Sequence, residues 1–264
     1  MTRTTRIRSA AAALVAAIMI GLPTLSGASA ELAADAVAAS RQRPAVIGVR
    51  VIGHSVNGRS IYAYRAGERG ADTTVVVIAA MHGNELAAQR IVQTLRDGYP
   101  ISGVDLWLIP TYNRDGAIRH DRQNARGVDL NRNYPRHWRP LTGNYYSGPR
   151  PASEPETRAM MRFLDRIDPD YVVSFHQPLR GLDVRDAKEP RFGRQLAENL
   201  RLPLRHIDCS GVCHSKMTPW FNARHEGFAI TVELGYSPSA RYLTKVGPRG
   251  LLRTFGATRD APPR

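Results

Sequence analysis

The sequence predicts a three-layer α/β/α sandwich with a mixed, largely parallel central sheet. Continuous β-branched runs recur along the chain, and amphipathic helical patterns alternate with them, which is the order typical of that fold class. The chain has 264 residues, of which 42% are hydrophobic. This length suits one domain of α/β size or two small ones, and it buries a core without disulfide bonds.

The predicted strands begin with a β-hairpin. Residues 49–56 and 59–65 flank Asn57-Gly58, a dipeptide that favours a two-residue type I′ turn. The strands that follow are continuous apolar runs, as expected where both faces of a sheet are covered. They are predicted at residues 73–80, 105–110, 171–175 and 228–233.

Helical spacing of apolar residues separates these strands. Ser153 is expected to cap one helix, with Glu156 completing a capping box, and Gly247-Pro248 is expected to interrupt the last one. Between the second and third buried strands, residues 111–152 form a long Gly-, Pro- and Asn-rich loop, which is usually functional in a compact domain. The helices are predicted at residues 86–95, 154–167, 191–200 and 243–255.

The N-terminus has the layout of a secretory signal peptide. Three early arginines precede an apolar run at residues 10–20, and Ala28-Ser29-Ala30 matches a cleavage pattern. The apolar run is short for a bilayer span, although a retained anchor stays an alternative. We therefore expect a signal peptide at residues 1–30, a linker or leader at 31–45 and the catalytic domain at 46–264. The mature chain would be secreted, in the periplasm or cell wall, without a membrane span.

The amino-acid composition limits the classes of binding partner that we expect. The net charge of +14 comes almost wholly from arginine and suits either acidic cell-wall polymers or nucleic acid. Basic and aromatic residues are not interleaved as in nucleic-acid-binding modules, so we expect no nucleic-acid partner. Two cysteines exclude a four-thiolate zinc site. Outside the cytoplasm, Cys209 and Cys213 are expected to form a disulfide that shapes their loop.

Metal-ligand residue types stand at three strand ends. His82 and Glu85 follow the first buried strand, His176 follows the strand at 171–175, and Glu233 ends the last one. Such ends meet at one edge of a parallel sheet, where α/β proteins place their chemistry. Two histidines and one glutamate, with a fourth position open, form a catalytic zinc set.

Each residue also has an ordinary structural explanation. A histidine at a strand end is often only hydrogen-bonded, and Glu85 could stabilise a helix N-terminus. The combination, together with the segment at residues 122–135, makes the pattern specific.

The ordered motifs resemble those of the zinc metallocarboxypeptidase family. They are HGNE at 82–85, GVDLNRNYP at 127–135, SFH at 174–176 and TVEL at 231–234. Residues 111–116 resemble the family's Asn-Pro-Asp-Gly loop, with Arg114 in the proline place. The resemblance spans residues 46–255 and, within the family, is strongest to the murein peptide amidase branch, whose members cleave the γ-D-glutamyl–meso-diaminopimelate bond.

The resemblance implies a carboxypeptidase-like fold and one zinc ion per chain, bound by His82, Glu85 and His176. It also implies roles for four further residues. Glu233 would be the general base acting on zinc-bound water, and Arg122 would stabilise the oxyanion. The substrate's terminal carboxylate would be held by Asn131 and Arg132.

The sequence departs from the family at one position. Digestive-type members carry a tyrosine where this chain has Gly211, and His214, Ser215 or Lys216 are candidates to replace its hydrogen bond.

Several functions stay open. A secreted zinc amidase that acts on murein peptides is the leading hypothesis, and a secreted carboxypeptidase that acts on protein C-termini is the alternative. A non-catalytic wall-binding module would lack a ligand or the base, and deacylases with a similar zinc site are typically cytosolic.

Overall fold

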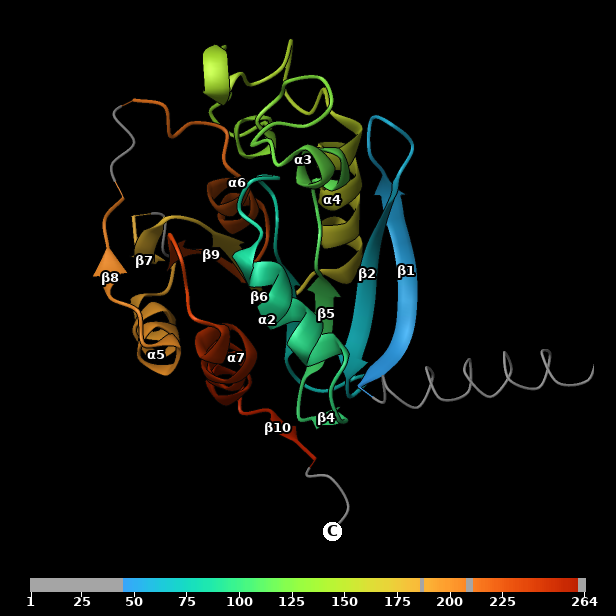
Figure 1. The fold of residues 1–264 in the computed structure, drawn as a ribbon, viewed down its shortest axis with the longest axis vertical. Helices are drawn as coiled ribbons and strands as arrows, with labels where there is room; N and C mark the ends of the chain where they lie inside the picture. The colour runs from blue at the N-terminus through green and yellow to red at the C-terminus, as the bar shows by residue number, and fades with distance from the viewer. Residues whose placement is uncertain (1–44, 186–187, 208–210, 261–264) are drawn as a thin grey trace, which may run out of the picture. The chain divides into compact units, whose positions relative to one another are not determined.

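The computed structural model describes residues 45–185, 188–207 and 211–260 (Figure 1). The predicted signal peptide and linker lie outside the described residues, apart from residue 45, so the boundaries at 30 and 45 stay predictions. The strands are β1 Val46–His54, β2 Ser60–Gly67, β3 Thr74–Ile78, β4 Ile101–Ser102, β5 Asp105–Ile109, β6 Tyr171–His176, β7 Leu179–Asp183, β8 Leu204–Arg205, β9 Phe228–Gly235 and β10 Thr258–Arg259. The helices are α2 Ala87–Arg96, α3 Arg114–Arg119, α4 Pro155–Ile167, α5 Pro190–Leu200, α6 Met217–Arg224 and α7 Gly247–Thr254, with short turns η1 Leu130–Arg132, η2 Gly143–Tyr145 and η3 Tyr242–Val246.

A mixed eight-stranded sheet forms the centre, in the order β1-β2-β5-β3-β6-β9-β7-β8. Its middle strands β5, β3, β6 and β9 run parallel, whereas β1, β2 and β7 pair antiparallel with their inner neighbours. The predicted mixed, largely parallel sheet is therefore confirmed.

Helices cover both faces of the sheet, because the side chains of each strand alternate between two apolar cores. Val75 and Val77 of β3 pack with α2, α5 and α7, whereas Val76 and Ile78 pack with α4 and α6. Figure 1 shows the two groups of helices on opposite sides of the strands. This arrangement is the predicted three-layer sandwich.

The hairpin turn differs from the prediction. Gly58 has φ of 75°, but Asn57 is not among the residues with positive φ, which a type I′ turn requires at both central positions. The amide of Gly58 donates to the carbonyl of Ser55 at 2.9 Å, and the amide of Ser55 donates to the carbonyl of Arg59 at 2.9 Å, which closes a three-residue loop over residues 56–58. Tertiary contacts fix this loop, since the amides of Val56 and Asn57 donate to the carboxylates of Glu156 and Asp115, at 3.0 Å each.

The predicted Ser153 cap is wrong. Helix α4 begins at Pro155, its N-cap position is Glu154, and no side chain caps it. The Ser153 hydroxyl is instead 2.8 Å from the Glu154 carboxylate and 2.9 Å from Asn133 Nδ2. The predicted break in the last helix is wrong, because the π-turn at Tyr242–Val246 continues directly into α7 at Gly247, and Val246 and Gly247 both have helical backbone angles.

Four short strands (β4, β7, β8 and β10) and two short helices (α3 and α6) were not predicted. Strands β7 and β8 and helix α6 are short, and the segments that form them carry no clear periodicity. Among the described residues, no helix is both long and apolar enough to cross a membrane.

Candidate active site

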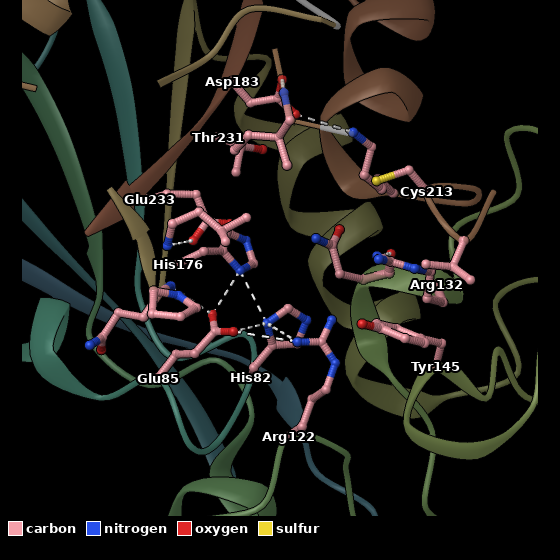
Figure 2. A pocket seen from close by; sticks show the side chains of 17 residues that line it. His82, Glu85, Arg122, Arg132, Tyr145, His176, Asp183, Cys213, Thr231 and Glu233 are labelled. Carbon is pink, nitrogen blue, oxygen red and sulfur yellow. Dashed lines mark hydrogen bonds and ion pairs between the residues drawn. The ribbon is translucent and has the colours of Figure 1, made fainter. Parts of the chain in front are cut away.

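A pocket of about 490 Å³ opens where β3, β6 and β9 end (Figure 2). These three strands are neighbours in the sheet, and β9 pairs with β6 so that Glu233 lies opposite His176. All seven residues predicted for metal binding, catalysis and carboxylate binding line this one pocket. They are His82, Glu85, Arg122, Asn131, Arg132, His176 and Glu233.

His82 is oriented by a buried carboxylate behind it. Its Nε2 lies 3.1 Å from Asp129 Oδ1, and both side chains are buried. A carboxylate accepts hydrogen bonds, so Nε2 carries a proton, and Nδ1 faces the pocket. Burial opposes the charge of Asp129, but His82 and Arg122 outweigh it and hold the pKa of Asp129 well below its usual range.

His176 is held in the same way from the other side. Its Nε2 lies 3.1 Å from the hydroxyl of Ser174, two residues earlier on β6, and its Nδ1 faces the pocket. The Nδ1 atoms of His176 and His82 are 3.2 Å apart. Each histidine thus presents the same ring nitrogen to one point.

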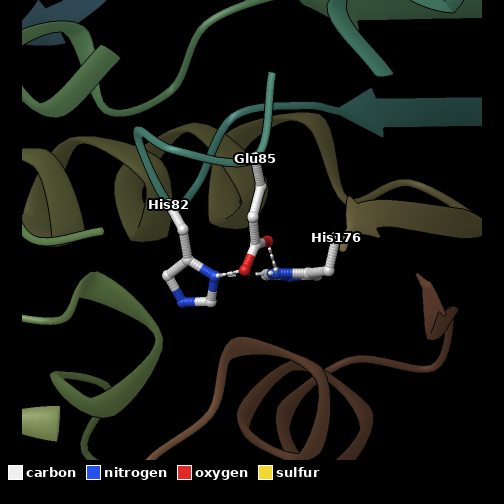
Figure 3. A group of neighbouring side chains, drawn as sticks. All are labelled: His82, Glu85 and His176. Atoms are coloured by element: carbon white, nitrogen blue, oxygen red, sulfur yellow. Dashed lines mark hydrogen bonds and ion pairs between the residues drawn. The ribbon is translucent and has the colours of Figure 1, made fainter. Parts of the chain in front are cut away.

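Glu85 completes the group (Figure 3). Its Oε1 is 2.8 Å from His82 Nδ1, and its Oε2 is 3.0 Å from His176 Nδ1. Burial alone would raise the pKa of Glu85, but the neighbouring His82 and His176 hold it well below its usual range. Glu85 is therefore an anion with no proton to share.

The three side chains fit a zinc ion. Their ligand atoms lie within 4.8 Å of one another, and the closest approaches resemble the roughly 3.4 Å between ligand atoms that surround a tetrahedral zinc ion. Two imidazole nitrogens and a carboxylate converge, which is a donor set that zinc binds when both imidazoles are neutral. The described residues therefore form a candidate His-Glu-His metal site.

Arg122 borders this metal site. Its Nε and Nη2 lie 2.9 and 2.8 Å from Asp129 Oδ2, which fixes the guanidinium plane. Its Nη1 remains directed at the site, 3.3 Å from His82 Nδ1 and 3.4 Å from Glu85 Oε1. The arginine thus presents one N–H group to any atom beside the metal.

Glu233 stands on the opposite wall of the pocket. It is 9% exposed, and the amide of Leu179 donates to its Oε2 at 3.4 Å. Burial raises the pKa of its carboxyl, His176 partly counters that rise, and the negative charge of Glu85 adds to it. The carboxyl is thus more basic than an exposed glutamate, and among the described residues its Oε1 has no hydrogen-bond donor.

Asn131 and Arg132 are presented by the short turn η1. Asp129 caps this turn by accepting the amide of Asn131 at 2.8 Å, and Asn131 Oδ1 accepts the amide of Met217 at 3.0 Å. Burial lowers the pKa of Arg132, which forms no ion pair with any residue that the structure describes. Its Nε is buried without a hydrogen-bond partner. A buried, unpaired guanidinium favours an anionic ligand.

Tyr145 and Asp183 also line the pocket, and no sequence pattern pointed to them. Tyr145 lies between the two arginines, with its ring centre 5.3 Å from the guanidinium carbon of Arg132 and 5.2 Å from that of Arg122. Asp183 and Lys216 line the far end of the pocket. The sequence pointed to Lys216 only as a candidate to replace the hydrogen bond of the family tyrosine. No spacing signal connects residues so far apart in the chain.

The predicted disulfide stays a prediction, because Cys209 lies outside the described residues. Cys213 lines the pocket, so its loop borders the site. Gly211 is exposed with φ of 84°. No side chain from that position reaches the pocket, whereas Tyr145 enters it from η2 (Figure 2).

The chain is similar to proteins of known family and fold. Residues 33–178 match the family model described as zinc carboxypeptidase. Murein peptide amidase A of Escherichia coli (strain K12) is 32% identical over 151 residues, which cover 49% of this chain and 58% of that relative. The crystal structure of murein-tripeptide amidase from Escherichia coli O157 has a TM-score of 0.67 and 26% identity, covering 81% of this chain and 94% of that one. Carboxypeptidase A from Helicoverpa armigera shares the fold, with a TM-score of 0.68, 16% identity and coverage of 86% and 72%.

Proposed function

Because the chain belongs to the zinc carboxypeptidase family, we propose that it is a zinc-dependent hydrolase of murein peptides. It would cleave the bond between γ-D-glutamate and meso-diaminopimelate and release the C-terminal residue. The named relatives are murein peptide amidases, and the chain spans 58% of the length of the one from strain K12.

One observation carries the proposal. The pocket joins a metal site, a buried carboxylate and a buried, unpaired arginine, and these are the groups needed to hydrolyse an amide next to a free carboxylate. Arg132 and Asn131 would hold that carboxylate, since a guanidinium matches it with two parallel hydrogen bonds. The scissile bond would then lie between Glu233 and Arg122.

His82, Glu85 and His176 would hold one zinc ion per chain. When bound, the ion supplies Lewis-acid activation of the attacking water and of the scissile carbonyl. Asp129 and Ser174 keep both imidazoles in the orientation that binding requires.

Glu233 would move the proton. It takes the proton from water as the water oxygen bonds to the scissile carbonyl carbon, and it returns that proton to the leaving nitrogen as the C–N bond breaks. Burial favours this exchange, because a raised pKa makes the carboxylate a stronger base. Arg122 donates from Nη1 to the carbonyl oxygen, where negative charge grows during the attack.

The location of the enzyme is also a proposal. The N-terminal pattern supports export across the cytoplasmic membrane, which would bring the protein to murein peptides and to acidic wall polymers. N-terminal sequencing of protein recovered from outside that membrane tests it. A start at Glu31 is expected, and an intact Met1 in recovered protein would argue for a retained anchor.

Two substrates test the proposed activity. Zinc-loaded protein should cleave L-Ala-γ-D-Glu-meso-diaminopimelate far faster than an ordinary L-peptide with a free C-terminus. Mass spectrometry of the products identifies the broken bond. Equal hydrolysis of both substrates would replace the amidase by a conventional carboxypeptidase, and hydrolysis of neither would reject both functions.

A further inference from the structure

The far end of the pocket contains a buried ion pair that the chemistry at the metal site does not use. Lys216 Nζ lies 3.5 Å from Asp183 Oδ2, with the two side chains 7% and 6% exposed. Asp183 ends β7, and Lys216 directly precedes α6. Both line the pocket, and Figure 2 shows Asp183 and Thr231 on the opposite side of it from Glu85.

Asp183 is anchored as an anion. Its Oδ1 accepts the amides of Arg185 at 3.1 Å and Ile207 at 3.3 Å, which leaves Oδ2 toward Lys216. The 3.5 Å separation exceeds the roughly 2.8 Å of a close charge-assisted hydrogen bond. Two opposite charges thus stand side by side at the end of a pocket without closing tightly on each other.

The walls that lead to this pair are mostly apolar. Leu179, Ile207 and Val212 line the pocket together with Cys213. Arg132 and Asn131 stand on another wall, where a substrate carboxylate would be held. A residue held there by its α-carboxylate would direct its side chain along apolar walls that suit methylene groups, toward Asp183 and Lys216.

We infer that the Asp183–Lys216 pair selects a C-terminal residue whose side chain ends in one carbon bearing both an ammonium and a carboxylate. Asp183 receives the ammonium group and Lys216 receives the carboxylate, so each charge gains an opposite neighbour from the substrate. The inference rests on the proposed function and adds the residues that determine specificity. A site built for two charged groups rejects a side chain that lacks either one, because a buried charge then loses its new partner.

Three substrates that differ only in this end group test the inference. They are L-Ala-γ-D-Glu linked to meso-diaminopimelate, to L-lysine, which lacks the distal carboxylate, and to L-2-aminopimelate, which lacks the distal amine. Wild-type protein should prefer diaminopimelate over either analogue by about 30-fold or more in kcat/KM, mainly through KM.

Variants of Asp183 and Lys216 then test which charged group of the substrate each residue binds. Lys216→Met should lose the preference for diaminopimelate over lysine, and Asp183→Asn should lose the preference over aminopimelate. Lys216→Arg keeps the charge and should retain the wild-type ratio. Lys245→Met, at an exposed position outside this pocket, is the matched control and should also retain it. Ratios measured within one sample do not depend on the fraction of folded protein.

The outcomes separate this inference from the proposed function. If wild-type protein cleaves all three substrates within threefold, the pair is only structural and the inference is wrong, although the amidase activity stands. An unchanged ratio in folded Lys216→Met would also overturn it. If wild-type protein cleaves none of the three substrates, the proposed function itself fails.

Discussion

The two ends of the pocket are built in different ways. At the metal end, His82 and Glu85 come from the loop after β3, and His176 ends the neighbouring parallel strand β6. The facing carboxylate of Glu233 comes from β9, which pairs with β6. At the recognition end, Arg132 comes from a short turn, Asp183 comes from β7, the second strand from the edge of the sheet, and Lys216 directly precedes α6. The sheet fixes the first end, whereas packed loops fix the second.

The two ends therefore place the residues that carry out the reaction apart from the residues that select the substrate. Groups that must converge within a few ångströms stand on the most rigid part of the fold, where the sheet sets their positions. Groups that choose the substrate stand on connections, which tolerate sequence change with less effect on the core. Changes at the metal end should therefore reduce turnover on every substrate, and changes at the recognition end should alter the choice between substrates.

The largest expected effect is at the metal end. Glu233→Gln should retain the fold and zinc but lose about 10²–10⁴-fold in kcat, because amide nitrogen and oxygen cannot accept the proton. Steady-state kinetics on the murein tripeptide measures it, with the exposed Glu226→Gln as the control. Activity of the variant within tenfold of wild type would remove Glu233 from the role of base.

Blocking the terminal carboxylate sharpens the comparison at the recognition end. Amidating the diaminopimelate carboxylate that faces Arg132 should cost roughly 2–5 kcal/mol in kcat/KM, because a buried cation loses its partner. In Arg132→Met the free and amidated substrates should be cleaved at similar rates. If kcat/KM differs between the free and the amidated substrate by as much in the variant as in wild type, Arg132 does not bind that carboxylate.

A smaller effect is expected for the buried carboxylate behind His82. Asp129→Asn should weaken zinc binding by roughly 10–100-fold, since the partner that orients His82 loses its charge. Competition with a chelator measures the affinity. The control variant Asp72→Asn, at an exposed position, should leave the zinc affinity unchanged. An unchanged zinc affinity in Asp129→Asn would show that His82 does not depend on the Asp129 carboxylate for metal binding.

The smallest effect concerns the loop beside the recognition end. If Cys209 and Cys213 are bridged, intact mass should lie two hydrogens below the reduced value, and Cys213→Ser should cost no more than about 3 kcal/mol of stability because the closed loop is short. Two free thiols titrated in natively folded, oxidatively expressed protein would contradict the pairing.

The sequence could predict that the residues of the metal end lie together, because its signals there are local. Runs such as the one before His82 identify buried strands, and a parallel sheet brings their ends together. The recognition end gave no such signal, since Tyr145, Asp183 and Lys216 meet only through the packing of separate loops. The hairpin turn was mispredicted for a related reason: contacts with Glu156 and Asp115 overrode the local preference of Asn57-Gly58.

Zinc content tests the central claim most directly. Elemental analysis of purified protein should find one zinc ion per chain in the wild type and no tightly bound zinc in His176→Ala. Circular dichroism should show that this variant retains its fold, because His176 lies at the end of β6 rather than within the packed core. Fully active protein without zinc, or unchanged zinc content in His176→Ala, would contradict the account.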